Sequence, residues 1–95
     1  ERGGMMNKAI ITVVGQDQVG IIAKVCTYLA DNKVNILDIS QTIVSGYFNM
    51  MMIVDTGESG KAFGEMADEL EETGRQIGVS IKCQKEEIFD QMHRI

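Results

Sequence analysis

Two polar corners of this sequence hold the residues most suited to binding a small ligand. One is the glycine-bounded stretch 15–22 (GQDQVGII), and the other is the stretch 35–41 (NILDISQ). A tight loop that opens a helix leaves backbone N–H groups without intrahelical partners, and the helix dipole attracts a carboxylate or another anion to that place. We expect Asp17 to be the N-cap, because its side chain can accept from the N–H of Val19 or Gly20. Taken alone, the first corner is more simply explained as an ordinary turn with its cap.

The residues that catalysis would need are few. The one histidine, His93, lies near the end of the sequence, and no Cys/His or Ser/His/Asp set has a spacing that suggests nucleophilic chemistry. No cluster has metal-ligand spacing. Cys26 and Cys83 lie in periodic apolar segments without a CxxC pair, which indicates two buried, reduced thiols rather than a disulfide or a metal site. We therefore expect a binding or interaction module, with no enzyme activity, no cofactor and no metal.

Composition excludes further classes of protein. The formal net charge is −5, and the nine basic residues are scattered, whereas nucleic-acid binding depends on clustered Lys and Arg. No apolar run reaches membrane-spanning length, and the first residues show no signal-peptide core. We expect a cytoplasmic protein that contacts neither nucleic acid nor membrane. Residues 1–6 are interpreted as a tail, and residues 7–95 as a single domain.

Hydrophobic periodicity then predicts the elements that position the two corners. Alternating or β-branched stretches predict strands at 8–14, 34–45, Tyr47–Asp55 and 79–84. Stripes at helical spacing predict helices at 18–33 and 61–77, and a short third helix at 86–95. This order predicts an α+β fold of the ferredoxin-like βαββαβ type, a four-stranded antiparallel sheet with two helices on one face plus the C-terminal helix. Right-handed crossovers place the first and third strands in the centre of the sheet.

Local details of these elements are also predicted. Asn32 is expected to end the first helix in the left-handed conformation, and Gly78 to end the second. The acidic run 65–72 is interpreted as a solvated helix face rather than a cation site. In the second strand we expect two faces, one with Leu37, Ile39, Gln41 and Ile43 and the other with Ile36, Asp38, Ser40, Thr42 and Val44.

Two functional classes known for this topology do not fit the sequence. An RNA-binding module needs solvent-facing aromatics on its central strands and a basic surface. The first strand has no aromatic residue, and the third carries only Tyr47 and Phe48 at its start. An enzyme of the acylphosphatase kind needs an arginine in the first loop to hold phosphate, but residues 15–22 contain no basic residue.

The two corners together resemble a known family. The pattern Asp17-x-x-Gly20-Ile21-Ile22, followed after one helix by Asn35-Ile36-x-Asp38-Ile39-x-Gln41, is similar to the ACT domain, a small regulatory module attached to many enzymes of amino-acid metabolism. The chain most closely resembles the stand-alone UPF0237 group, and more distantly the N-terminal half of the glycine cleavage system transcriptional repressor. The likeness covers the chain from about Lys8 onward. Val19 is a departure, because many members have proline there.

The resemblance implies a side-by-side homodimer, with second strands joined edge to edge and an amino-acid effector at the interface. In such a dimer the first corner of one copy faces the start of the second strand in the other. By matching position, one wall of the site would be formed by Asp17, Val19, Gly20, Ile21 and Ile22, and the other by Asn35, Ile36 and Asp38. The N–H groups of the first wall suit the ligand's carboxylate, and the amide and carboxylates suit its ammonium group.

A second interpretation remains open at this point. The chain could be a dimeric protein–protein interaction module that binds no small molecule. An apolar edge strand would be an aggregation risk unless a symmetry mate covered it. Met50–Met52 is explained most simply as core filling, although methionines on both faces of a strand also suit an adaptable contact with an unknown protein.

Overall fold

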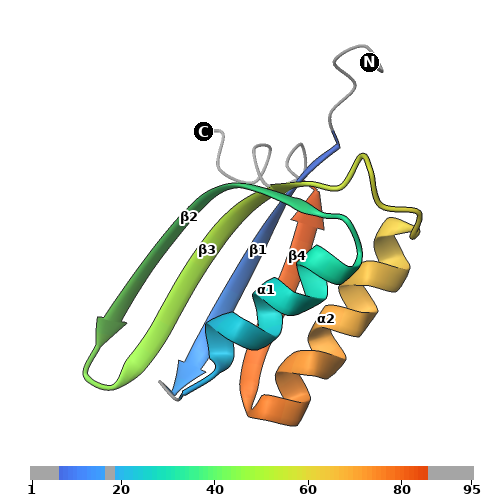
Figure 1. Ribbon diagram of the computed structural model, residues 1–95. Helices are drawn as coiled ribbons and strands as arrows, with labels where there is room; N and C mark the ends of the chain where they lie inside the picture. Colours follow the sequence, from blue (N-terminus) through green and yellow to red (C-terminus); the bar gives the residue numbers. More distant parts are fainter. Residues whose placement is uncertain (1–6, 17–18, 86–95) are drawn as a thin grey trace, which may run out of the picture.

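The computed structural model describes residues 7–16 and 19–85, which form an antiparallel four-stranded sheet and two helices (Figure 1). The elements in chain order are β1 (Lys8–Gln16), α1 (Ile21–Asp31), β2 (Asn35–Val44), β3 (Tyr47–Asp55), α2 (Phe63–Ile77) and β4 (Val79–Lys85). The strand order is β2-β3-β1-β4, so the first and third strands lie in the centre as the crossover rule predicts. The ferredoxin-like βαββαβ fold is confirmed.

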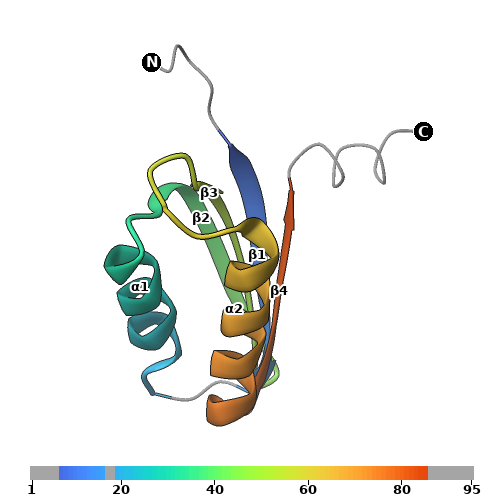
Figure 2. The same ribbon diagram turned by 90° about the vertical axis from the view of Figure 1, so that its right-hand side faces the viewer.

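The molecule has two layers, with both helices on one face of the sheet (Figure 2). Side chains alternate across a strand, and on β1, β3 and β4 most of the alternate residues that face the helices are buried. The core consists of Ala9, Ile11, Val13, Ile21, Val25, Leu29, Val34, Phe48, Met50, Met52, Val54, Met66, Leu70, Val79 and Ile81. The predicted stripe of α1 accordingly faces the core through Ile21, Val25 and Leu29.

The β2–β3 hairpin and the end of α2 agree with the prediction. Ser45 and Gly46 have φ of 53° and 82°, as the tight turns that match the twist of paired strands require. β3 begins at Tyr47, and its buried residues alternate with exposed Asn49 and Met51. Gly78 ends α2 with a φ of 81°. Met50 and Met52 are core residues, whereas Met51 is on the opposite face.

The edge strand β2 differs from its predicted alternation. A bulge interrupts its pairing with β3, because Ile36 lies opposite Val54 but Asp38 lies opposite Ile53. Leu37 is the extra residue, so the alternation of side chains between the two faces shifts by one residue there. Ile36 therefore lies on the same face as Ile39, which corrects the prediction of opposite faces.

The ends of β1 and α1 also differ. β1 continues to Gln16, because Gly15 and Gln16 still find partners at the start of β3. α1 begins at Ile21 and its N-cap is Gly20, with no side-chain hydrogen bond at the cap, so the prediction of Asp17 as N-cap is wrong. The residue that turns the chain into this helix is a glycine with positive φ.

At the C-terminal end of α1 the left-handed residue is Lys33, not Asn32. Lys33 has a φ of 60°, whereas Asn32 has a φ of −104°. The side-chain amide of Asn32 donates to Tyr28 O at 2.9 Å, and its backbone N–H donates to the same oxygen at 3.2 Å. The helix at 86–95 and the tail at 1–6 lie outside the described residues.

Candidate functional site

The first predicted corner is shaped by Gly20, which begins α1. Its φ of 95° is favourable for glycine and strained for residues with a Cβ. The Gly20 carbonyl accepts from Lys24 N–H at 2.9 Å, which closes the first turn of the helix. The first turn has no acidic side chain, so no carboxylate of its own is placed on the N–H groups that the helix start leaves unpaired.

The side chains at this corner point in different directions. Val19 is fully exposed, Ile22 is 38% exposed, and Ile21 is buried in the core. Ile21 can therefore offer a ligand only its backbone, whereas Ile22 and Val19 can offer apolar side chains. Asp17 lies outside the described residues.

The second predicted corner lies at the start of β2. Asn35 is exposed and lies opposite Asp55, Ile36 is half-buried, and Asp38 is exposed. The Asp38 carboxylate accepts from the backbone N–H of Ile39 at 2.9 Å. Asn35 is therefore the more available polar group, because Asp38 already has a partner within its own strand.

A single copy of the chain does not bring the two corners together. Gly20 lies at the start of α1 and Asn35 just beyond its end, and an 11-residue helix is about 16 Å long. Figure 1 shows the two corners at opposite ends of the molecule. A cleft made by both walls therefore needs a second copy.

The structure also has a groove between the two helices that is not predicted from the sequence. It lies along α1 and α2, and its lining residues are Gly20, Ala23, Lys24, Thr27, Tyr28, Asp31, Thr73 and Gln76. Small and polar residues opposite the core stripe of α1 are visible in the sequence. Their apposition to Thr73 and Gln76 is not visible there, since it depends on how the two helices pack.

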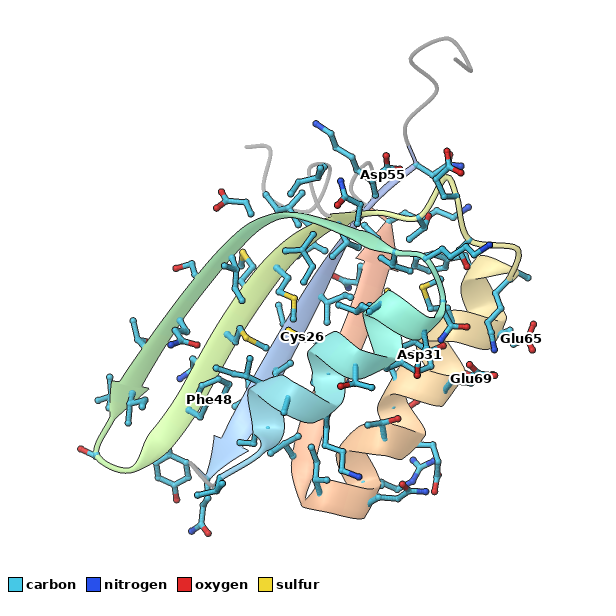
Figure 3. All side chains as sticks on the ribbon, in the orientation of Figure 1. Cys26, Asp31, Phe48, Asp55, Glu65 and Glu69 are labelled. Atoms are coloured by element: carbon cyan, nitrogen blue, oxygen red, sulfur yellow. The ribbon has the colours of Figure 1, made fainter. Side chains whose placement is uncertain are left out.

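Beside this groove, one acidic residue joins the two helices. Glu69, labelled in Figure 3, accepts from the Tyr28 hydroxyl at 2.5 Å and from Lys61 Nζ at 2.8 and 3.0 Å. Hydrogen bonds from Lys61 and then Tyr28 hold the pKa of Glu69 below its ordinary value. Burial and the bond to Glu69 raise the pKa of Tyr28. Glu69 is thus a structural exception to the solvated face predicted for the acidic run.

This network predicts a pH dependence of stability. The lowered pKa means that Glu69 stabilises the fold fully above its ordinary pKa of 4.5. The stabilisation is lost as the pH falls through the lower folded-state pKa. We expect Glu69→Gln to lower the urea midpoint at pH 7, and the difference from the unchanged chain to shrink as the pH falls below about 4.5.

The matched control for this prediction is Glu71→Gln on the same helix. Its ion pair with Arg75 is longer, at 3.9 Å, and is between exposed side chains, so water and salt screen it. The assignment would be contradicted if Glu71→Gln lowered the urea midpoint as much as Glu69→Gln, or if the effect of Glu69→Gln did not shrink as the pH was lowered.

The cysteines and acidic residues give no sign of catalytic or metal chemistry in the described part of the chain. Cys26 and Cys83 are both free and half-buried, so the predicted reduced thiols are present but less enclosed than expected. Burial raises the pKa of Cys83 to about 11, which disfavours the nucleophilic thiolate. Among residues 7–16 and 19–85, no group of His, Cys, Asp and Glu is placed to hold a metal. Within the same residues, no helix is long and apolar enough to cross a membrane.

Comparisons with known proteins agree with this fold. The sequence profile of the ACT domain family matches residues 7–84. A UPF0237 protein of Bifidobacterium longum is 69% identical over 90 residues, which cover 95% of this chain and 100% of that protein. The solved ACT domain protein from Streptococcus pneumoniae is 42% identical, with a TM-score of 0.77 over 90% of this chain and 94% of that one.

A more distant structure shares the fold alone. It is a candidate glycine cleavage system transcriptional repressor, 21% identical, with a TM-score of 0.75 over 86% of this chain and 47% of that one. The chain therefore belongs to the ACT domain family and is similar to the UPF0237 proteins. This membership supports a regulatory ligand-binding module rather than an enzyme.

Proposed function

We propose that this protein is a non-catalytic regulatory module that forms a homodimer and binds a small effector, an amino acid, at the dimer interface. The proposal depends on one observation: in a single ACT-domain chain the two polar corners lie apart, at the two ends of α1. Pairing β2 with the β2 of a second copy is the arrangement that the family resemblance implies. It would bring the first corner of one copy to the second corner of the other.

The exposure of β2 supports the dimer. All but one of its residues are exposed, and Leu37, Ile39, Ile43 and Val44 are between 41% and 62% exposed. An edge strand with apolar side chains and open backbone groups favours pairing with another strand. In a two-fold symmetric dimer both copies use the same surface, so β2 of one copy can pair with β2 of the other.

The chemistry of the two corners supports an amino-acid ligand. Its carboxylate would lie against the N–H groups of Gly20 and Ile21, because the missing Cβ of Gly20 allows close approach. Its ammonium group would be received by Asn35, with Asp17 and Asp38 as further acceptors in the proposal. Ile22, Val19 and Ile36 would surround its side chain. We place the protein in the cytoplasm, and its two free cysteines suit a reducing compartment.

The experiment is calorimetric titration of the full chain with the twenty free amino acids. Saturable binding that is lost in Asn35→Ala and kept in Asn49→Ala is the expected result. Asn49 is an exposed asparagine on β3 that lies opposite Val14, on the face of the sheet that carries neither α1 nor α2, so it controls for a general loss of amide groups. Light scattering after size exclusion tests the dimer separately.

A second candidate function is a dimeric interaction module with no small-molecule ligand. Two observations favour it. The Asp38 carboxylate already accepts a hydrogen bond from the backbone of its own strand, and the exposed apolar side chains of β2 are suited to protein contact. A dimer that binds no amino acid in the titration would favour this candidate. A monomer at micromolar concentration would count against both.

A further inference from the structure

The face of the sheet that carries neither α1 nor α2 is covered at one end only. On β1, Ile10 and Val14 both lie on this face, because Ile11 and Val13 face the helices. Ile10 is 5% exposed, whereas Val14, four residues along the same strand, is 47% exposed. Ile10 is therefore shielded from water, whereas Val14 on the same strand and face is open to it.

The same contrast extends to the adjacent strands. Ile10 lies opposite Ile53 on β3 and Gln84 on β4, and both are half-buried. Val14 lies opposite Asn49 and Ser80, and both are exposed. The covered area thus spans three strands at the end where β4 finishes. The other end remains open as a shallow groove lined by Thr12, Val14, Ser40, Gln41, Thr42, Asn49, Met50 and Met51.

The chain leaves the sheet beside the covered area. β4 ends at Lys85, which lies opposite Ala9, one residue before Ile10. Ten residues follow, 86–95, and their apolar side chains Ile88, Phe89, Met92 and Ile95 have helical spacing. Ten helical residues are about 15 Å long, enough to cross three strands spaced about 4.8 Å apart.

Both the face and the segment carry charges of both signs, because Asp38 and Asp55 share this face with Lys8 and Lys82, and the segment has His93 and Arg94 near its end. The segment 86–95 has three acidic residues among its first five, and Lys82 is exposed on this face opposite Thr12. Lys8 begins β1 at the covered end and shares the face of Ile10. A segment with an apolar side on Ile10 and acids toward Lys8 and Lys82 would match this surface.

We propose that residues 86–95 dock as an amphipathic segment on the helix-free face, over Ile10 and Ile53. In this arrangement the C-terminal segment occupies the β1–β3–β4 end of the face. The groove around Thr12, Asn49 and Met51 would stay uncovered.

The test measures thiol reactivity at two positions of the full chain, in a background with Cys26→Ala and Cys83→Ala. Ile10→Cys and Val14→Cys place a probe at the covered and open ends of one strand. We expect the Ile10→Cys thiol to react with a water-soluble disulfide reagent about tenfold more slowly than the Val14→Cys thiol, because burial limits thiolate access. Adding Phe89→Ser is expected to speed the Ile10→Cys reaction and leave the Val14→Cys reaction unchanged.

Gln91→Ser is the matched control within the segment, since it removes a polar side chain of similar length. An Ile10→Cys rate that Phe89→Ser leaves unchanged would overturn the proposal. So would a rate that rises only with Met5→Ser and Met6→Ser, because the cover would then be the N-terminal residues. Circular dichroism of each variant separates local uncovering from unfolding, and a Phe89→Ser chain that unfolds is replaced by Ile88→Ser in the same assay.

Discussion

Gly74→Ala is expected to destabilise the fold, although alanine is the better helix former. Gly74 lies in α2 where the helix packs on β4, and it is buried. A Cβ at this position would lie 2.7 Å from Val79 O and 2.9 Å from Ile81 Cγ1. The first contact is with backbone and cannot be relieved by a side-chain rotation. We expect a net loss of about 1–3 kcal/mol, because overpacking outweighs the helix-propensity gain of about 1 kcal/mol.

The matched control is Gly64→Ala in the same helix. Apart from its chain neighbours and the nearby backbone of its own helix, a Cβ at Gly64 would have no heavy atom within 4 Å, so only the propensity term acts there. We expect Gly64→Ala to leave stability unchanged or to raise it by up to about 1 kcal/mol. Urea unfolding of both variants measures the difference. Two variants shifted in the same direction would contradict the close packing of α2 on β4.

The parts of the fold that could be predicted are those that depend on local chemistry. The hairpin at Ser45-Gly46, the end of α2 at Gly78 and the two faces of β3 follow from turn residues and alternation within a few positions. The element order then leaves few arrangements, because crossover handedness fixes which strands are central. These features can be predicted without knowing which residues pack against them.

The parts that failed depend on contacts between distant residues. Asp17 has the side chain of an N-cap, but the helix begins only after Gly20, where the chain turns. The bulge at Leu37 depends on how β2 aligns with β3, so alternation alone placed Ile36 on the wrong face. The groove between α1 and α2 depends on helix packing. The two-walled site was predicted only through family resemblance, since its walls lie at opposite ends of a single chain.

Ile39→Lys is expected to convert the proposed dimer into a monomer while leaving the fold intact. Ile39 lies near the middle of β2 and is 44% exposed, so little of its side chain contributes to the core. In an antiparallel β2–β2 pair the two copies of a central residue lie close to the two-fold axis. One substitution therefore places two lysines near each other in the interface. Lysine on an edge strand also opposes strand pairing, which is how natural sheets protect their edges.

We expect the dissociation constant of the dimer to rise by about 100-fold or more, which corresponds to about 3 kcal/mol. Sedimentation equilibrium across a concentration series measures this change, and urea unfolding should show a small shift by comparison. Ser80→Lys is the matched control, because Ser80 is an exposed residue on β4, the opposite edge of the sheet. If Ser80→Lys dissociates the dimer and Ile39→Lys does not, the copies meet through β4, and the two polar corners would not form one cleft. If Ile39→Lys abolishes both the dimer and amino-acid binding, the effector site must be shared between copies, since neither Gly20 nor Asn35 has been changed.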